Sequence, residues 1–325
     1  MTLRIGILGA SRVAVYAMIA AAKDVDGVEV IAVAARDPER ARGFAEQHHI
    51  AKTYPDYRAL IEADDVDAVY NGLPPNLHSQ WSIAAVEAGK PVLCEKPFAL
   101  STEDVEAMLA AEARTGMLIM EAQHTFYHPR HARIREIVQG GILGKIAAIT
   151  SQFDVPVAET PGEIRWDGAV GGGALWDLGV YPLFWLRASM GQEPVLVSAD
   201  HALNSKGADI WTDATFVFPC GAVGAIRCSM ERKFAAWLNI EGARGTVFVD
   251  NPLSPNVQTL TLTVDGEATE ETFTSRPTYS FQLEAFRDAV LSGAPAATCG
   301  DDSLKTIRLL SEIRSTAQAA LPKKE

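Results

Sequence analysis

Short apolar runs alternate with helical segments in the first part of the chain, and this alternation constrains the fold more than any other feature. The runs that we expect to form strands are residues 4–9, 28–34, 51–54, 68–71, 91–94 and 117–122. Strands separated by helices need crossover connections, and such connections make a parallel sheet with helices packed on its faces. We therefore predict that residues 1–122 form an α/β domain built on a doubly wound parallel sheet.

The pattern changes after Ala122, where strand-like runs follow one another with few helices between them. These runs are residues 146–155, 195–201, 212–218, 222–232, 236–241, 245–250 and 259–264. Consecutive short strands favour antiparallel pairing, so we predict that residues 123–325 form an α+β domain with a large, mostly antiparallel open sheet. Residues 214–218 are apolar on both faces, so we expect the outer face to be buried in a homodimer or homotetramer. We expect residues 321–325 to be frayed.

The length and charge of the chain limit its functional class. A chain of 325 residues exceeds the size at which a single core stops growing, which supports two domains. Its formal net charge of −12 disfavours binding to nucleic acid, because phosphate contacts need a basic surface. No apolar run approaches the ~20 residues of a membrane span, and the first residues lack a signal-peptide pattern. We expect no membrane partner.

The cysteines and histidines favour a reduced compartment and no metal site. The four cysteines, Cys94, Cys220, Cys228 and Cys299, form no CxxC pair and no dense spacing. His124 and His128 have the spacing of a helix turn, but the carboxylate that completes a zinc-binding helix motif is absent. We therefore expect a cytoplasmic protein that holds no metal.

A glycine turn follows the first strand. Gly9, Ser11 and Ala14 align with the pattern G-x-G-x-x-G/A of dinucleotide-binding proteins, although serine replaces the middle glycine. Gly9 suits a tight turn and Ala14 suits close helix packing, while the helix N-terminus offers amides to a pyrophosphate. An ordinary βα turn is the alternative for this stretch alone. Gly9, Ser11, Arg12 and Val13 are the candidate cofactor contacts here.

The end of the second strand bears on the choice between NAD and NADP. An acid directly at this position binds the ribose 2′-hydroxyl of NAD, whereas an arginine suits the 2′-phosphate of NADP. Arg36 occupies the strand end and Asp37 follows it. The pattern therefore favours NADP, with NAD as the alternative if Arg36 is only a surface charge beside the following helix.

Two polar loops follow the fourth and fifth strands. They are Leu73-Pro74-x-Asn76-x-His78 and Glu95-Lys96-Pro97. Ligands of open α/β sheets lie beyond the carboxyl ends of the strands, so both loops are placed to meet a ligand. Lys96 could carry chemistry there, although most lysines are only solvated surface charges.

A second group of candidate residues follows a run of three glycines. Gly171-Gly172-Gly173 lets the backbone approach a ligand closely, and Asp177 and Tyr181 then stand four residues apart. On a helix these two side chains would share one face, which suits a proton-transfer pair. The alternative is a glycine-rich loop in which Asp177 caps the next helix and Tyr181 packs in the core.

Together and in this order, these motifs resemble the Gfo/Idh/MocA oxidoreductase family, which includes glucose–fructose oxidoreductase, inositol dehydrogenase and dimeric dihydrodiol dehydrogenase. The resemblance covers nearly the whole chain and rests on Gly6-Ile7-Leu8-Gly9-Ala10-Ser11, Leu73-Pro74-x-Asn76-x-His78, Glu95-Lys96-Pro97 and Gly171-Gly172-Gly173-Ala174-x-x-Asp177-x-Gly179-x-Tyr181. It implies an N-terminal Rossmann domain and a C-terminal α+β domain with a large open sheet. It also implies oligomers formed through that sheet and a nicotinamide cofactor clamped between the domains.

The resemblance also implies roles for individual residues. Lys96 resembles the active-site lysine of the family, Glu95 its cofactor-side acid and Asp177 its orienting acid. Tyr181 stands where inositol-type members have histidine, as in the branch that contains dihydrodiol dehydrogenase, xylose dehydrogenases and glucose–fructose oxidoreductase. Arg36 fits the NADP preference of that branch, and Ser11 departs from the commonest second glycine. The cofactor-binding candidates are Gly9, Ser11, Arg12, Val13, Arg36, Asp37, Leu73, Pro74, Asn76, His78, Glu95, Lys96 and Arg165.

We hypothesise reversible hydride transfer between C4 of a nicotinamide and a sugar, a cyclic polyol or a related hydroxy or keto compound. Tyr181 would exchange a proton with the reacting oxygen. Lys96 would lower the pKa of that phenol or carry the proton itself, and Asp177 would hold a substrate hydroxyl or Lys96. A free tyrosine has a pKa of about 10 and a free lysine a pKa of about 10.4, so both pKa values must be lowered for these groups to work at neutral pH.

The substrate itself stays open at this stage. The expected pocket combines Asp177 and Tyr181 with Arg165, Trp166 and Tyr279, which suits a polyhydroxylated ring as well as an aromatic diol. A keto-sugar reductase of the same fold and a non-catalytic NADP-binding sensor are the alternatives. The presence of a lysine, an acid and a tyrosine together favours an enzyme, because a sensor has no need of all three.

Overall fold

The computed structural model describes residues 2–254 and 259–320, and the expectation about residues 321–325 lies outside them. The chain divides into two compact units. The first consists of Met1–His124 and Pro277–Ile307, and the second of Thr125–Arg276 and Arg308–Glu325.

The first unit is built on a six-stranded parallel sheet. Its strands are β1 (Leu3–Leu8), β2 (Val28–Ala34), β3 (Lys52–Tyr54), β4 (Ala68–Asn71), β5 (Val92–Cys94) and β6 (Ile119–Glu121). The spatial order is β3-β2-β1-β4-β5-β6, and every neighbouring pair is parallel. This is the strand order of a Rossmann fold, so the predicted doubly wound parallel sheet is confirmed.

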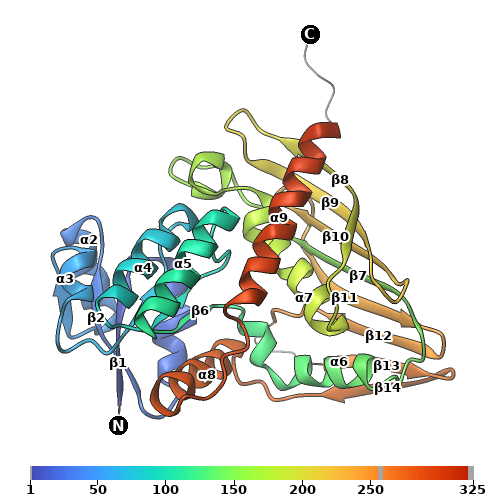
Figure 1. Ribbon diagram of the computed structural model, residues 1–325, viewed down its shortest axis with the longest axis horizontal. Helices are drawn as coiled ribbons and strands as arrows, with labels where there is room; N and C mark the ends of the chain where they lie inside the picture. Colours follow the sequence, from blue (N-terminus) through green and yellow to red (C-terminus); the bar gives the residue numbers. More distant parts are fainter. Residues whose placement is uncertain (1, 255–258, 321–325) are drawn as a thin grey trace. The chain divides into compact units, whose positions relative to one another are not determined.

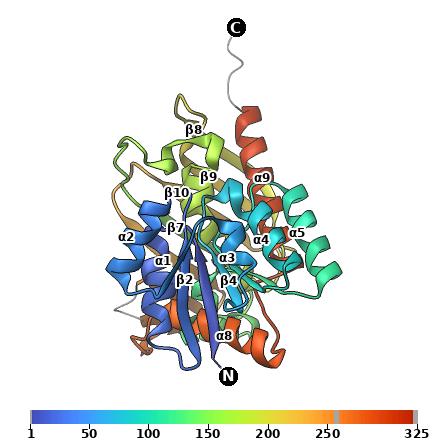
Figure 2. The same cartoon turned by 90° about the vertical axis from the view of Figure 1, so that its left-hand side faces the viewer.

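Helices connect these strands and pack on both faces of the sheet. They are α1 (Arg12–Ala14), the π-helix η1 (Val15–Ala20) that continues it, α2 (Pro38–His48), α3 (Tyr57–Ile61), η2 (Pro75–Leu77), α4 (His78–Glu87) and α5 (Thr102–Thr115). Figure 2 shows α1 and α2 on one side of the sheet and α4 and α5 on the other. Because both faces are covered, the central strands are almost wholly buried, which explains why they are mostly apolar in the sequence.

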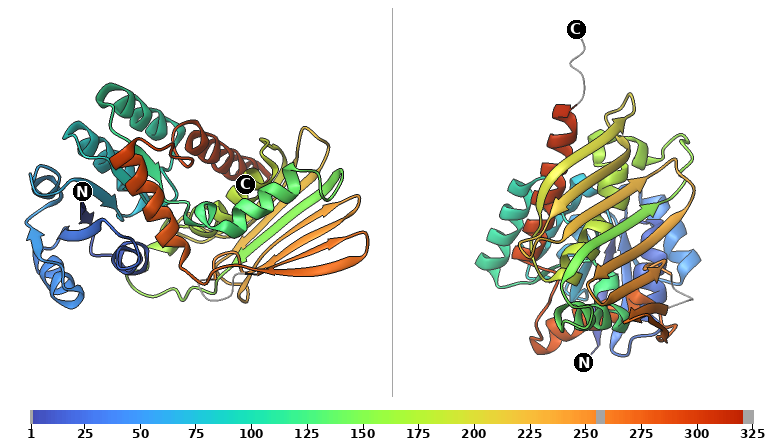
Figure 3. Two further views of the ribbon diagram at one scale, coloured as in Figure 1. Left: turned by 90° about the horizontal axis from the view of Figure 1, so that it is seen from below. Right: turned by 90° about the vertical axis from the view of Figure 1, so that its right-hand side faces the viewer.

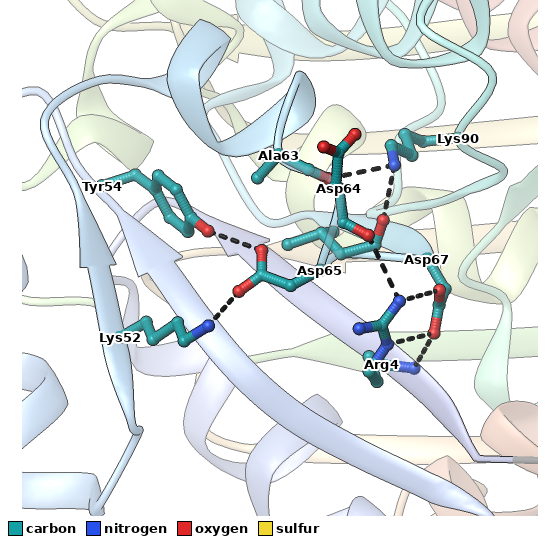
Figure 4. Close-up of polar contacts among 9 residues, drawn as sticks. Arg4, Lys52, Tyr54, Ala63, Asp64, Asp65, Asp67 and Lys90 are labelled. Carbon is teal, nitrogen blue, oxygen red and sulfur yellow. Dashed lines mark hydrogen bonds and ion pairs between the residues drawn. The ribbon is translucent and has the colours of Figure 1, made fainter.

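Ion pairs tie the acidic turn before β4 to strands β1 and β3 (Figure 4). Arg4 on β1 binds Asp67 with Nε–Oδ2 and Nη2–Oδ1 distances of 2.9 and 2.7 Å. Asp65 pairs with Lys52 on β3 and accepts a hydrogen bond of 2.6 Å from Tyr54. That bond raises the pKa of Tyr54 to about 12. The Arg4–Asp67 pair lies at the amino ends of β1 and β4, whereas Tyr54 is the last residue of β3, so the turn is tied to both the central and the edge strand.

Residues 277–307 return to the first unit, although the sequence boundary at residue 123 assigned them to the second domain. They include α8 (Thr278–Ser292) and the start of α9 (Asp301–Ala320). Tyr279 stacks on His124 with ring centroids 3.9 Å apart. Thr298 donates to the Glu121 carbonyl at 2.7 Å, beside a bridge between Met120 and Cys299. These long-range contacts leave no local signal in the sequence.

The second unit contains an eight-stranded sheet, whose strands lie side by side in the right-hand view of Figure 3. Its strands are β7 (Ile146–Asp154), β8 (Val195–Leu203), β9 (Asp209–Val217), β10 (Val223–Ser229), β11 (Ala235–Gly242), β12 (Gly245–Asp250), β13 (Thr259–Val264) and β14 (Glu267–Thr272). The order is β14-β13-β12-β11-β7-β10-β9-β8, with β7 and β10 parallel and the other neighbours antiparallel. The predicted large, mostly antiparallel sheet is confirmed.

One face of this sheet is covered by helices and the other exposes apolar side chains. The helical segments of the unit include α6 (Pro129–Gln139), η4 (Ile164–Trp166), η5 (Gly168–Val170), the π-helix η6 (Leu175–Gly179) and α7 (Val180–Met190). The nearly wholly buried α7 packs against β7 and β10 (Figure 1). On the exposed face, Val195, Val217 and Val223 are cross-strand neighbours with 61%, 38% and 49% of their surface exposed.

Two further features concern only the part of the chain that the structure describes. No helix there combines the length and the apolar character that a membrane crossing requires. No cluster of three or more His, Cys, Asp or Glu side chains there is arranged to hold a metal ion.

Candidate active site

The turn after β1 brings the first and fourth strands close together at their carboxyl ends. Gly9 has φ +93, a conformation that favours glycine, and its N–H donates to the Ala34 carbonyl at 2.9 Å. A Cβ on Gly9 would lie 3.0 Å from Leu73 Cδ2 and 3.3 Å from the Gly72 carbonyl oxygen. A larger residue would therefore be strained in its backbone and crowd the loop after β4.

Ser11 starts the helix that follows this turn. Its Oγ accepts a hydrogen bond of 3.4 Å from the Ala14 N–H, so serine caps the helix at the position where the dinucleotide pattern has its middle glycine. Arg12 is exposed and Val13 is half-buried in the first turn. The replacement of glycine by serine is thus compatible with the strand–turn–helix geometry that a pyrophosphate needs.

Two arginines lie near the end of β2, and the sequence analysis identified only one of them. Arg36 is exposed, while Asp37 caps α2 by accepting from the Glu39 N–H at 3.0 Å. Arg40, in the first turn of α2, donates to the Ala10 carbonyl in the glycine turn at 2.9 Å. Burial raises the pKa of Tyr57, and the charges of Arg36 and Arg40 oppose that rise, so both guanidinium groups lie near this phenol.

The loops after β4 and β5 are tied together by a buried histidine. The two ring nitrogens of His78 lie 2.8 Å from the carbonyl oxygens of Leu73 and Pro97. Asn71 holds the same segment by donating to the His78 carbonyl at 3.1 Å and to Ser82 Oγ at 3.0 Å. Burial lowers the pKa of His78 to about 4, although its carbonyl partners favour the protonated ring. The contacts of its two ring nitrogens fix the shape of both loops.

The remaining residues of the loop after β4 are more accessible. Pro74 is half-buried and Asn76 is exposed. Since they start η2 directly beyond the carboxyl end of β4, they stand on the ligand side of the sheet, as the sequence predicted.

Glu95 and Lys96 follow β5, and a buried tyrosine orients the acid. The Tyr70 phenol donates to Glu95 Oε1 at 2.8 Å, and Glu95 is only 6% exposed. Glu95 also accepts from the Lys96 N–H at 3.3 Å. Burial raises the pKa of Tyr70 well above its usual value, and the charge of Glu95 adds to this, so the phenol stays a donor. The Lys96–Pro97 peptide bond is cis.

Aromatic rings from three segments gather near Lys96 in the first unit. Burial lowers the pKa of His124 to about 3, and the charge of Lys96 contributes to that shift, which places the two groups close together. His124 stacks on Tyr279 and its Nδ1 lies 2.6 Å from Thr278 Oγ1. Tyr279 also contacts Tyr16, with ring centroids 5.4 Å apart. The structure therefore groups Tyr279 with Lys96, within one unit.

Asp177 and Tyr181 belong to the second unit, on the continuous helix formed by η6 and α7. The Asp177 N–H donates to the Gly173 carbonyl at 3.1 Å, and its side chain is half-buried. Asp177 therefore lies inside the helix and does not cap it, because the cap position is Ala174. Tyr181 is 7% exposed and packs edge-on against Phe153, with ring centroids 5.7 Å apart. Most of the Tyr181 ring is therefore packed in the core, which was the alternative prediction from the sequence.

Arg165 is held by a neighbouring acid in the same unit. Its Nε and Nη2 donate to Glu163 at 2.9 and 2.7 Å. Trp166 is buried beside it. Next to this pair is a surface cavity of about 370 Å³, lined by Glu159, Thr160, Pro161, Gly162, Glu163, Ile164, Asp167 and Lys206.

The geometry thus forms two groups of candidate residues. In the first unit, Gly9, Ser11, Leu73, His78 and Glu95 with Lys96 come together at the carboxyl ends of β1, β4 and β5. This is the edge at which an open α/β sheet binds its ligand, beside the point where the strand order reverses. In the second unit, Arg165, Asp177 and Tyr181 lie on segments joined by the glycine turn.

Comparison with known families decides what these two groups represent. Residues 3–123 match the sequence model GFO_IDH_MocA, described as an oxidoreductase family with an NAD-binding Rossmann fold. Residues 131–248 match that of the GFO/IDH/MocA C-terminal domain. The chain belongs to the Gfo/Idh/MocA oxidoreductase family. It is accordingly an NAD(P)-dependent oxidoreductase that acts on CH–OH groups or the corresponding carbonyls.

Similar members of the Gfo/Idh/MocA family come from several different organisms. An uncharacterized oxidoreductase of Rhizobium meliloti is 35% identical over 97% of this chain and 97% of its own length. The D-xylose 1-dehydrogenase (NADP(+)) 2 of Haloferax volcanii is 29% identical over 96% of this chain and 97% of its own. The crystal structure of a 3-ketoreductase from Actinomadura kijaniata, in complex with NADP and TDP-benzene, has a TM-score of 0.90 at 28% identity, covering 97% of this chain and 98% of that one.

Proposed function

We propose that this protein is an NADP-dependent dehydrogenase of aldoses or of related cyclic diols and polyols. The observation that carries the proposal is the arrangement after β5, where Lys96 follows a buried Glu95 that Tyr70 orients. Such an arrangement fixes an acid and an amine at the ligand edge of a Rossmann sheet. The similarity to an NADP-dependent xylose dehydrogenase supports the same reaction class.

The residues of the first unit fit a nicotinamide dinucleotide. The Gly9 turn and the helix that Ser11 caps would hold the pyrophosphate, and Arg36 would hold the 2′-phosphate of NADP. We include Arg40 in the phosphate site because it reaches the same glycine turn. The other candidates, Arg12, Val13, Asp37, Leu73, Pro74, Asn76, His78, Glu95 and Arg165, would contact or shape the cofactor site. A bound nicotinamide supplies the hydride acceptor or donor at its C4.

Three side chains would handle the substrate. Tyr181 would give a proton to the reacting oxygen or take one from it through its Oη. Lys96 would carry that proton onward or supply positive charge near the oxygen through its Nζ, and Asp177 would orient a substrate hydroxyl through its carboxylate. General acid–base assistance of this kind contributes typically about 100-fold to 10,000-fold to a rate.

A second candidate function is reduction of a keto sugar. The similarity to the 3-ketoreductase of known structure favours it, because that alignment covers nearly all of both chains. In a keto-sugar reductase, Tyr181 would give a proton to the carbonyl oxygen, whereas in a dehydrogenase it would take a proton from the hydroxyl group. A non-catalytic NADP-binding sensor is the third candidate.

We further propose that the protein works in the cytoplasm as a homodimer or homotetramer. The exposed apolar row of Val195, Val217 and Val223 is the surface that we assign to the contact between copies. The four cysteines are free, which supports a reduced compartment. Within each copy, residues 1–122 would bind the nucleotide and residues 123–325 would bind the substrate and form the oligomer, with residues 277–307 supporting the nucleotide unit.

A substrate panel tests the proposal. NADP reduction would be followed at 340 nm with aldoses, inositols and trans-dihydrodiols, and NADPH oxidation with a nucleoside-diphosphate keto sugar. Turnover of an aldose or diol supports the dehydrogenase, and turnover of only the keto sugar supports the reductase. Tight NADPH binding without turnover on any of these compounds would favour the sensor.

A further inference from the structure

A buried carboxylate that has no part in the proposed chemistry contacts the helix of Asp177 and Tyr181. Asp209 stands at the start of β9 and is 4% exposed. Its Oδ2 accepts two hydrogen bonds, one from the Leu175 N–H at 2.7 Å and one from Thr212 Oγ1 at 2.7 Å. Leu175 is the first residue of η6, so the acid binds the N-terminal end of that helix.

The helix depends on this remote acid because its own cap position cannot help. The cap residue of η6 is Ala174, whose methyl group cannot accept a hydrogen bond. The first N–H groups of a helix have no partner within the helix, and a buried one is costly to leave unsatisfied. Asp209 supplies the acceptor and also places negative charge at the positive end of the helix.

The glycine turn is shaped to admit this carboxylate. Gly173 has φ +128, and a Cβ there would lie 2.0 Å from Asp209 Oδ1, which is far inside contact distance. The Gly173 N–H donates to the Arg165 carbonyl at 2.9 Å. A Cβ on Gly172 would lie 2.7 Å from the same carbonyl oxygen. The turn therefore packs Asp209 and the backbone of Arg165 against the start of one helix.

Burying the carboxylate of Asp209 has an energetic cost. Burial raises its pKa, and the hydrogen bonds from Thr212 and Leu175 oppose the rise. A buried carboxylate is tolerated when its hydrogen bonds offset the loss of water. The main role of the carboxylate at this position is to hold the backbone of η6. One of its oxygens accepts both hydrogen bonds, and one of the two donors is an N–H group of that helix.

We propose that Asp209 is a positioning residue for the reaction. Its carboxylate fixes the start of η6 and thereby sets the place of Asp177 and Tyr181 further along the same continuous helix. This inference rests on the proposed function, because it gives Asp177 and Tyr181 their importance. A separate hydrogen bond, from the Gly173 N–H to the Arg165 carbonyl, holds the Arg165 segment at the same turn.

Amide hydrogen exchange tests the structural half without any substrate. In Asp209→Ala the N–H groups of residues 175–181 exchange faster by about 5- to 30-fold, the range that loss of a helix cap corresponds to. Asp209→Asn keeps the protection to within about threefold, because its amide oxygen can accept both hydrogen bonds. The matched control is Asp213→Ala, which removes an acid of the same strand that pairs with Arg232 at 2.9 Å. Equal protection of residues 175–181 in Asp209→Ala and the control overturns the proposal.

Kinetics test the functional half and separate it from the proposed function. Asp209→Ala lowers kcat by about 10- to 100-fold, since small misplacements of reacting groups have effects of that size, while the NADPH dissociation constant stays within about twofold. Tyr181→Phe is measured beside it, and so is the double variant. If Asp209 acts through Tyr181, the double variant is no slower than Tyr181→Phe alone.

Each kinetic outcome decides a different claim. Full losses that multiply in the double variant contradict an action through Tyr181 and leave Asp177 as the side chain that Asp209 positions. A wild-type rate in Tyr181→Phe contradicts the proposed function and the role of Asp209 in the reaction together, whereas a loss in Tyr181→Phe with a normal rate in Asp209→Ala contradicts only the role of Asp209. If Asp209→Ala does not fold, Thr212→Val serves instead. It removes one hydrogen bond to the same oxygen and slows turnover by about 2- to 10-fold. An unchanged rate and unchanged exchange in that variant overturn the proposal.

Discussion

The phenol of Tyr70 donates a hydrogen bond of 2.8 Å to Oε1 of Glu95, and both side chains are buried. Tyr70→Phe leaves the acid without this donor in a buried site. We expect the free energy of unfolding to fall by about 1–3 kcal/mol and NADPH to bind more weakly, because a buried acceptor that loses its partner keeps its desolvation cost.

Urea denaturation of the wild type and of Tyr70→Phe measures this loss in the free energy of unfolding. The slopes m of the two proteins are compared at the same time. The matched control is Tyr54→Phe, which removes the hydrogen bond to the partly exposed Asp65. There the loss should stay below about 1 kcal/mol. Equal losses in the two variants would mean that Tyr70 has no special role in holding Glu95.

His78 should make the stability of the protein fall in mild acid. Burial lowers the pKa of His78 to about 4, below its value of about 6.5 in the unfolded chain, so the unfolded state binds the proton more readily. Its contribution is complete above pH ~6.5 and is lost as the pH falls toward ~4, by about 3 kcal/mol in total. His128 adds a loss in the same direction, because burial lowers its pKa to about 4.

The comparison that isolates His78 is the unfolding free energy of wild type and His78→Gln measured from pH 7.5 to 4. Glutamine does not titrate, so the variant should lose less stability over this window than the wild type. Parallel curves would show that His78 is not the neutral, buried group that its environment indicates.

Arg36 and Arg40 should set the preference for NADPH over NADH. Fluorescence titrations of both nucleotides should show tighter binding of NADPH, and Arg36→Ala and Arg40→Ala should each weaken NADPH by about 10- to 100-fold with little effect on NADH. That range corresponds to the loss of a hydrogen bond to a charged group. Arg42→Ala is the control, since Arg42 lies on α2 with Arg40 and pairs with Glu39. Equal binding of NADH and NADPH by the wild type would transfer the ribose contact to Asp37.

The exposed valines of the second sheet should hold copies of the chain together. Light scattering after size exclusion should find a dimer or tetramer for the wild type and a smaller species for Val217→Asp, because a charge in an apolar contact is left unpaired. Leu291→Asp is the control, as Leu291 on α8 has a similar exposure of 40%. A wild-type monomer, or an unchanged mass in Val217→Asp, would exclude this surface as the contact.

The fold was largely predictable because its strands have clear local patterns. The parallel strands β2 and β4 are mostly apolar, and their ends match the expected ones. The edge strand β14 escaped prediction because Glu267–Thr272 is polar and mostly exposed, and is paired only with β13. The return of α8 to the first unit was also invisible, since it depends on contacts such as the stacking of Tyr279 on His124.

The candidate site was predictable only where a residue stands in a motif. Lys96, Asp177 and Tyr181 follow recognisable patterns, and their roles stay predictions. Tyr70, Arg40 and Asp209 were missed because each acts through a partner that is 25, 30 or 34 positions away in the chain. The glycine run predicted a close approach of the backbone to a ligand. At Gly173 the group that comes close is the side chain of Asp209 on β9, which could not be read from the run itself.

The most direct test of the central claim is the turnover of Lys96→Ala and Tyr181→Phe. It uses the best substrate of the panel, with NADPH binding measured on the same samples. We predict that each variant loses at least about 100-fold in kcat, the lower range for loss of acid–base assistance, while NADPH binding changes by no more than about threefold. Near-normal rates in both variants would contradict the account and remove these two side chains from the chemistry.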